Sequence, residues 1–284
     1  MNDKKQNLFW EAVKRFTYNK AAVIGAVYLA ALLFIIIFAN VLVPVEKVTY
    51  YSILDRKLTP CAEHWFGTDN LGRDLFARVI YGTRITVGVS VGATLASLLI
   101  GASIASVCAL NHKADFVIMR MVEIFNCIPS VLFAMVLLAV MGGSVVNLII
   151  TMTIVSIPGF IIHVRSILFS IMEQDYIKAA RLSGTRGVKL VRKHILPNAV
   201  DTMIVDATMT ISGMMLSAAG MSAIGLGISP PSPEWGAMIN AAAGYYRELP
   251  HMLLFPAAAV VLTALAINLV GDGLRDALDP KAMK

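Results

Sequence analysis

Long apolar stretches recur along this 284-residue chain, and short polar segments separate them. A helix needs about 18–20 predominantly apolar residues to cross a bilayer. Stretches of this length lie at 21–43, 85–110, 116–141, 145–164, 200–228 and 252–270. The pattern therefore predicts an all-α integral membrane protein with six transmembrane helices.

Glycine and proline positions add detail to two of these helices. Gly88 and Gly92 are spaced four residues apart in the second stretch, and Gly101 extends the same lightly built face. In lipid, such residues let helix backbones approach closely, so this helix is expected to pack against others. Pro129 predicts a kink in the third helix.

The composition places the chain outside the soluble class. Hydrophobic residues make up 57% and charged residues 15% of the sequence, whereas soluble domains are about 25% charged. The net charge of +6 does not indicate nucleic-acid binding, because the basic residues cluster at the edges of the apolar stretches rather than on a soluble module with stacking aromatics. Cys61 and His64 form a lone Cys-x-x-His pair without a second half, so no metal site is predicted.

The distribution of Lys and Arg predicts the orientation. Several basic residues precede the first apolar stretch, which is too long for a signal peptide and is expected to be retained. With a cytoplasmic N-terminus, segments 44–83, 142–144 and 229–250 are external. Segments 112–115, 165–197 and the tail from 271 then lie inside, and both termini are cytoplasmic.

One internal segment, residues 173–197 (the basic loop), is unusually polar. It carries Lys178, Arg181, Arg186, Lys189, Arg192 and Lys193. Its pattern predicts a first short helix from Asp175, a break at Gly184 and a second helix over 188–195 that Pro197 ends. The second helix is expected to bury Val188, Val191 and Ile195. A loop that only fixes topology needs no small residues or turn glycine, so two short helices that dock on a soluble partner are favoured.

The basic loop resembles the EAA loop of ABC-importer permeases. "KAARLSG" supplies Ala179, Ala180 and Gly184, and "HILPN" supplies Leu196 and Pro197 in register. Lys178 stands where the family has Glu. The resemblance implies that the loop is the coupling element that docks in a cleft of a cytoplasmic ATP-binding subunit. The implied coupling residues are Tyr176, Lys178, Ala179, Ala180, Arg181, Gly184, Leu196 and Pro197.

Three further blocks resemble the C-type permeases of dipeptide, oligopeptide, glutathione and nickel importers. They are "HWFGTDNLGRDLFARVIYGTR", "GLGISPPSPEWGAMIN" and "NLVGDGLRDALDPK". The resemblance implies a type I ABC-importer (MetI-like) transmembrane domain at 84–271. It also implies an extra N-terminal span with an external loop within 1–83 and a cytoplasmic tail at 272–284. The implied location is the bacterial cytoplasmic membrane.

The family pattern also implies the partners and the source of energy. These are a homologous B-type permease that completes a heterodimer, two cytoplasmic ABC ATPase subunits and an extracytoplasmic substrate-binding protein. The sequence has no Walker A loop, so ATP and Mg²⁺ are expected on the partner ATPases and no cofactor on this chain. A nickel or metal-chelate importer of the same family is the alternative cargo assignment.

Other function classes need ionisable groups inside the spans. Glu123 and His163 lie near span ends, and Asp201 and Asp206 lie early in the fifth span. They form no paired catalytic motif, which argues against an intramembrane enzyme. Asp206 is the best candidate for an ion-coupled transporter, but it is expected instead to contact a partner helix or to line a water-filled cavity.

Residues on two spans are candidates for the translocation pathway. They would line it if the third and fifth helices face the heterodimer axis, although Met also fills irregular gaps in ordinary cores. These candidates are Asn126, Ser130, Met209, Met214, Met215 and Ser217.

Two features of the external segments have further predicted roles. Thr68, Asp69 or Asn70 is expected to cap a short helix over 75–80, which lies at the outer membrane surface with Arg73 and Arg78 away from its apolar side. Trp235, in the proline-rich "SPPSPEWG", predicts either an interfacial anchor or a turn that dips back toward the pore mouth.

Overall fold

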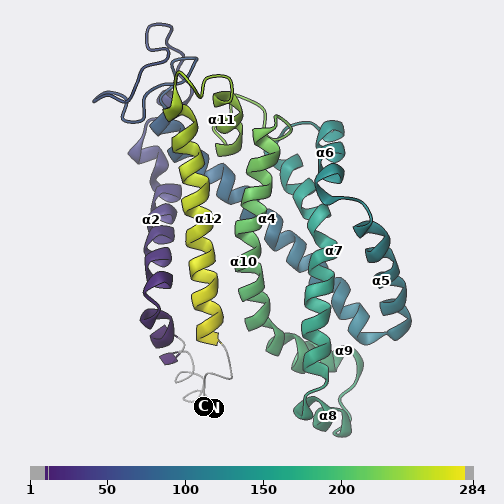
Figure 1. Cartoon of the computed structure of the whole chain (residues 1–284). Coiled ribbons are helices and arrows are strands. Elements are labelled where there is room, and N and C mark those ends of the chain that lie inside the picture. Colours follow the sequence, from purple (N-terminus) through teal and green to yellow (C-terminus); the bar gives the residue numbers. More distant parts are fainter. Residues whose placement is uncertain (1–9, 12, 279–284) are drawn as a thin grey trace.

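The computed structural model describes residues 10–11 and 13–278, which form a bundle of long helices (Figure 1). No β-strand occurs in this described part, so the predicted all-α class is confirmed. The long helices are α2 (Lys20–Leu42), α4 (Leu75–Leu110), α7 (Val145–Met172), α10 (Leu196–Ala223) and α12 (Pro250–Leu278). The shorter elements are α3 (Glu46–Thr49), α5 (His112–Asn126), α6 (Ser130–Met141), α8 (Asp175–Leu182), α9 (Gly187–Leu190), the π-helical segment η1 (Val191–Ile195) and α11 (Trp235–Ala242).

Five helices of the described chain are long and apolar enough to cross a membrane. The remaining predicted span is divided into α5 and α6, which are bent by 81° relative to each other. Pro129 lies at this break, where it has no N–H to donate and disfavours helical backbone at the residue before it. The predicted kink is therefore present, but it is a full break in the helix.

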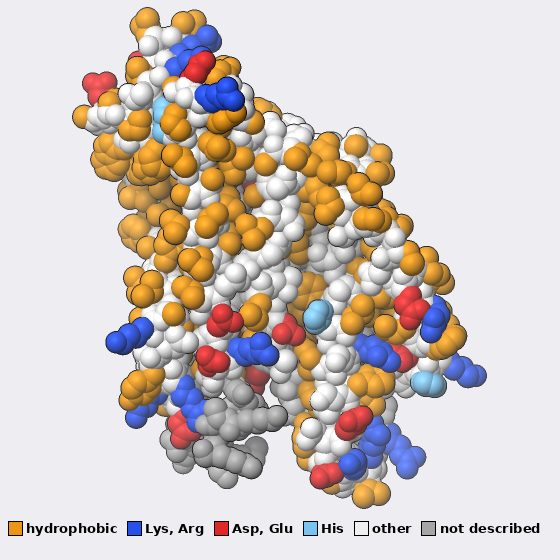
Figure 2. All heavy atoms as spheres, viewed as in Figure 1, with side chains coloured by type: hydrophobic (Ala, Val, Ile, Leu, Met, Phe, Trp, Pro, Cys, Tyr) orange, Lys and Arg blue, Asp and Glu red, His pale blue; other side chains and the backbone are white. Residues whose placement is uncertain are grey.

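The surface agrees with a bundle that crosses a bilayer. Apolar side chains are spread over the middle of the face in Figure 2, between backbone and uncharged side chains, and Lys and Arg gather toward its two ends. Outward-facing residues such as Leu33, Leu99 and Val136 are more than half exposed. A water-soluble protein rarely exposes so large an apolar area, whereas lipid tails cover it readily.

Helix α4 crosses the centre of the bundle and packs against α7 and α10, while α12 packs between α2 and α10. The α4–α7 contact is tight at Gly101, where an added Cβ would lie 2.6 Å from Cβ of Phe160. Around Gly88 there is open space within 4 Å. The close packing predicted for α4 therefore occurs at Gly101 and not, within this chain, at Gly88.

The prediction of a separate surface helix over 75–80 was wrong, because these residues are the first turns of the 36-residue α4. Asp74, not one of the residues 68–70, caps the helix by accepting from the N–H of Ala77 at 2.7 Å. Arg78 is buried and donates to the carbonyl oxygens of Val48 and Pro231. These acceptors satisfy the guanidinium, so Arg78 does not need to face away from the apolar side.

Trp235 is buried, which overturns its prediction as an interfacial anchor. It begins α11, and its indole Nε1 donates to the carbonyl oxygen of Val79 on α4 at 2.9 Å. The adjacent Glu234 caps α11 by accepting from the N–H groups of Gly236 and Ala237. The segment thus turns back into the bundle against α4, α10 and α12.

Two predicted boundaries fall inside helices. The division between residues 83 and 84 lies within α4, and the tail expected from residue 272 begins within α12, which continues to Leu278. Helix α7 likewise runs to Met172, so Arg165 belongs to this helix and not to the following loop. There the Arg165 guanidinium makes two hydrogen bonds, of 2.5 and 2.7 Å, to the carboxylate of Asp115 on α5.

Candidate functional site: the basic loop and the adjacent groove

The first half of the basic loop forms a helix that ends in a tight glycine turn. Helix α8 is followed by Gly184, whose φ of +87° is the left-handed region that favours glycine. The N–H of Thr185 donates to the carbonyl of Ala180, and the N–H of Gly184 donates to that of Arg181. This pair of bonds is a Schellman motif, which confirms the predicted break at Gly184.

One apolar side chain ties α8 to the ends of the long helices. Ile177 is fully buried and packs in a cluster with residues such as Leu168 of α7 and Leu190 of α9. Ala180 is partly buried at the edge of the same cluster. The loop is therefore a folded unit seated on the bundle, with Tyr176, Lys178, Ala179 and Arg181 on its exposed side.

The second half of the loop is not a separate helix. Helix α9, η1 and α10 form one unbroken 37-residue helix from Gly187 to Ala223. Pro197 lies in the first turn of α10 and does not end the element, contrary to the prediction. The wide π turn of η1 stands before it, where a proline would otherwise clash with the preceding turn. Leu196, just before it, is partly buried.

The buried face of this second half is made by Leu190, Val191 and Ile195. The expectation that Val188 shares that face was wrong, since Val188 is 66% exposed. Leu182, just before the glycine turn, is 90% exposed. The sequence analysis did not identify these two apolar side chains as exposed. Leu182 could have been recognised as exposed, because it ends an eight-residue helix in which Ile177 already provides the buried contact.

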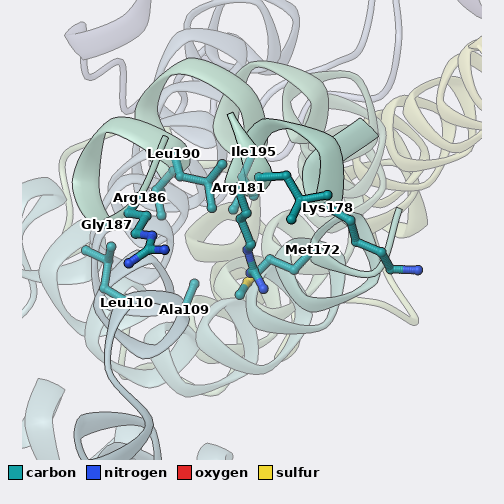
Figure 3. A pocket seen from close by; sticks show the side chains of 11 residues that line it. Ala109, Leu110, Met172, Lys178, Arg181, Arg186, Gly187, Leu190 and Ile195 are labelled. Atoms are coloured by element: carbon teal, nitrogen blue, oxygen red, sulfur yellow. The ribbon is translucent and has the colours of Figure 1, made fainter. Parts of the chain in front are cut away.

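Three basic residues of the loop, Lys178, Arg181 and Arg186, are among those that line a cavity of about 540 Å³. Its floor is apolar and includes Ala109, Met172 and Leu190. In Figure 3, Arg181 and Arg186 extend over this cavity, whereas the ammonium group of Lys178 points away from it. Lys178 makes an exposed ion pair with Asp175, one turn earlier on α8, at 3.0 Å.

A groove lies between α7 and α10, bordered by α5 and α6. It consists of two cavities, of about 570 Å³ and 300 Å³, which share Val155, Ser156 and Thr210 as lining residues. We refer to both together as the α7–α10 groove. Five of the residues proposed for the pathway line it: Asn126, Ser130, Met209, Met214 and Ser217. Asp206 and His163 line the larger cavity, as expected for an Asp206 that borders a cavity.

Met215 lies apart from this groove. Its side chain is fully buried in the cluster that joins α10 to α11 and α12. Neighbours on a helix point in different directions, so Met214 and Met215 lie on different sides of α10. The structure therefore brings together five of the six candidate pathway residues and separates Met215 from them.

Comparison with known families fits this arrangement. Residues 97–284 match the family described as "Binding-protein-dependent transport system inner membrane component". The chain belongs to this family. Residues 7–60 of this permease also match the "N-terminal TM domain of oligopeptide transport permease C". Helix α2 lies within that second match, which confirms an extra N-terminal span ahead of the type I transmembrane domain.

Curated relatives of the permease are similar over nearly their whole length. The "Glutathione transport system permease protein GsiD" of Escherichia coli O6:K15:H31 (strain 536 / UPEC) is 38% identical over 278 residues, which cover 96% of this chain and 89% of the relative. The "Dipeptide transport system permease protein DppC" of Alkalihalophilus pseudofirmus is 36% identical over 272 residues, covering 95% and 89%. The chain is thus similar to permeases throughout its length.

Proposed function

We propose that this chain forms half of the translocation pathway of an ATP-driven importer that carries peptides across the bacterial cytoplasmic membrane. A homologous B-type permease would complete a heterodimer, and an extracytoplasmic binding protein would deliver the cargo. The peptide cargo is supported by relatives whose names state glutathione and dipeptide transport. A nickel or other metal chelate is the alternative cargo.

The folded basic loop is the observation that carries this proposal. It presents Leu182 and Val188 to the exterior beside Arg181 and Arg186. Exposed apolar side chains with a polar rim are typical of a docking surface. In Figure 1, α8 lies at the opposite end of the bundle from the loop between α3 and α4. We assign the α8 end to the cytoplasm, with both chain termini on that side.

Two ATPase subunits would bind there, one to this loop and one to the equivalent loop of the partner permease. In this scheme ATP and Mg²⁺ act on the ATPase subunits, and this chain supplies no catalytic residue or cofactor. Its contribution is mechanical, because the loop makes different contacts in the two ATPase states and so biases the pathway between inward- and outward-facing forms.

The test is Gly184→Val in the assembled transporter. A β-branched residue at a positive φ costs about 1–3 kcal/mol, enough to shift a conformational equilibrium by about 5- to 150-fold. No atom lies within 4 Å of an added Cβ at Gly184, so the chain should still insert and assemble. We expect uptake of labelled dipeptide to fall at least about fivefold while ATP hydrolysis persists.

Gly142→Val is the matched control. Gly142 has a similar φ of +83° and equally open surroundings, but it lies between α6 and α7, away from the basic loop. Its replacement should leave the coupling of uptake to ATP hydrolysis unchanged. Normal coupling in Gly184→Val would refute the assignment of the loop. Uptake of labelled nickel, without uptake of dipeptide, would show that a metal chelate and not a peptide is the cargo.

A further inference from the structure

A carboxylate in the α7–α10 groove has no partner within the described chain. Asp206 is partly buried, and among the described residues no Lys, Arg or His side chain forms an ion pair with it. Besides the backbone bonds of the helix, the described residues give Asp206 one hydrogen bond, from the Thr210 hydroxyl to its backbone carbonyl, and none to its carboxylate. His163 lines the same cavity without pairing with Asp206.

The position of Asp206 makes this unpaired charge costly. It lies six residues after residue 200, where the fifth apolar stretch begins, which is about 9 Å along the helix at 1.5 Å per residue. The hydrocarbon core of a bilayer is about 30 Å thick. A carboxylate at this depth is expensive unless water or a cation faces it. A cation that passes through the groove would therefore be attracted to this point.

The rest of the lining indicates what kind of cation fits. Apart from His163, the other polar groups are neutral: Asn126, Ser130, Ser156, Thr210 and Ser217. Gly159 and Gly213 leave open space on the two facing helices. Neutral hydroxyl and amide groups suit the peptide bonds of an extended cargo, which need hydrogen-bond partners but no charge.

A bare divalent metal fits this lining less well. No cluster of three His, Cys, Asp or Glu side chains able to hold a metal occurs in the described residues. A single carboxylate with neutral donors instead matches a monovalent ammonium group. The groove also lacks a Lys or Arg that would bind a carboxylate, so it distinguishes the two ends of a zwitterionic peptide.

We propose that Asp206 is a cargo-binding residue that pairs with the α-ammonium group of a peptide as it passes along the α7–α10 groove. This inference rests on the proposed function and names the group of the cargo that the permease recognises. The peptide chain would then lie along Ser156 and Thr210, which border both cavities. A single charge pair of this kind orients the cargo without holding it tightly.

Protection from cysteine labelling tests the proposal without the binding protein. Ser156→Cys is introduced into the assembled, ATP-free transporter, and the two exposed native cysteines, Cys61 and Cys127, are replaced by Ser. The rate of maleimide labelling at position 156 is read on this chain by mass spectrometry. It is measured with dialanine and with N-acetyl-dialanine at equal concentrations. We expect dialanine to slow labelling at least about threefold and the acetylated peptide, which lacks the ammonium group, to have no effect.

The carboxylate is then tested with two asparagine substitutions. Asp206→Asn should abolish protection by dialanine, whereas Asp201→Asn, at an exposed position outside the groove lining, should preserve it. Equal protection by both peptides, or protection that survives Asp206→Asn, would overturn the role of Asp206. The comparison of the two peptides needs no Asp206 variant, so equal protection would overturn the proposal even if that variant fails to assemble.

The labelling test of Asp206 and the uptake test of the proposed function can fail independently of each other. Absence of protection by either peptide would overturn the groove as the cargo site. Dipeptide uptake by the unmodified transporter would still show whether the chain serves peptide import. Failure of that uptake would instead refute the proposed cargo.

Discussion

The tight contact between α4 and α7 at Gly101 offers a stability test that can be worked from the structure. Replacing Gly101 with Ala places a Cβ 2.6 Å from Cβ of Phe160 and 3.1 Å from its carbonyl carbon. Carbon atoms pack best at about 3.5–4.0 Å, so α4 and α7 must separate locally by roughly 1 Å. Overpacking of this kind costs about 1–3 kcal/mol. For a chain of this size each kcal/mol lowers Tm by about 2–4 °C.

Gly88→Ala provides the matched control on the same helix, because nothing lies within 4 Å of its added Cβ. Alanine is a better helix former than glycine by about 1 kcal/mol, so this variant should be neutral or slightly more stable. We would measure Tm of the chain, purified alone in detergent, by the loss of its monomer peak after heating. Gly101→Ala should melt about 2–12 °C lower than the parent. Equal Tm values for the two variants would refute the idea that α4 and α7 touch at Gly101.

Two further predictions concern topology and pH. A cysteine placed by Arg186→Cys should react with a membrane-impermeant maleimide only from the cytoplasmic side, and reaction from outside would reverse the proposed orientation. Burial raises the pKa of the Glu234 carboxyl, an effect that the hydrogen bonds from Gly236 and Ala237 oppose. A raised folded-state pKa gives stability that is present below the unfolded pKa and lost as pH rises through the folded value. The Tm of Glu234→Gln should therefore rise relative to that of the parent as pH increases above the unfolded Glu pKa of about 4.3. A Tm difference between the two proteins that stays the same at all pH values would contradict this reasoning.

Apolar runs and turn residues could be read from the sequence because they reflect local physics. The spans follow from the length of uncharged helix that a bilayer requires. The turn at Gly184 follows from the conformational freedom of glycine and the α8 residues before it. Lys178 was also identified as a departure from the family pattern, and the structure places it in an ion pair with Asp175 on the exposed side of the loop.

The errors arose where a distant segment decides the outcome. Arg78 could be buried at the start of α4 because carbonyl groups from residues 48 and 231 accept its hydrogen bonds, and no local pattern reveals those acceptors. Trp235 is likewise buried in the bundle, where its indole N–H donates to the carbonyl of the distant Val79. Pro197 does not end the helix, because a π turn precedes it. Val191 and Ile195, at the two ends of that turn, are buried in a cluster with residues of other helices, and this packing is not visible in the local sequence.

The continuous helix from Gly187 to Ala223 contains both the second half of the basic loop and one wall of the groove. Figure 1 shows that this helix changes direction toward its α9 end, where the π-helical η1 precedes α10. No linker separates the two parts, so Asp206 and the exposed Val188 belong to the same hydrogen-bonded element. A displacement of the loop by a docked subunit would therefore reach the groove wall through one continuous backbone, without a change in side-chain contacts between separate helices.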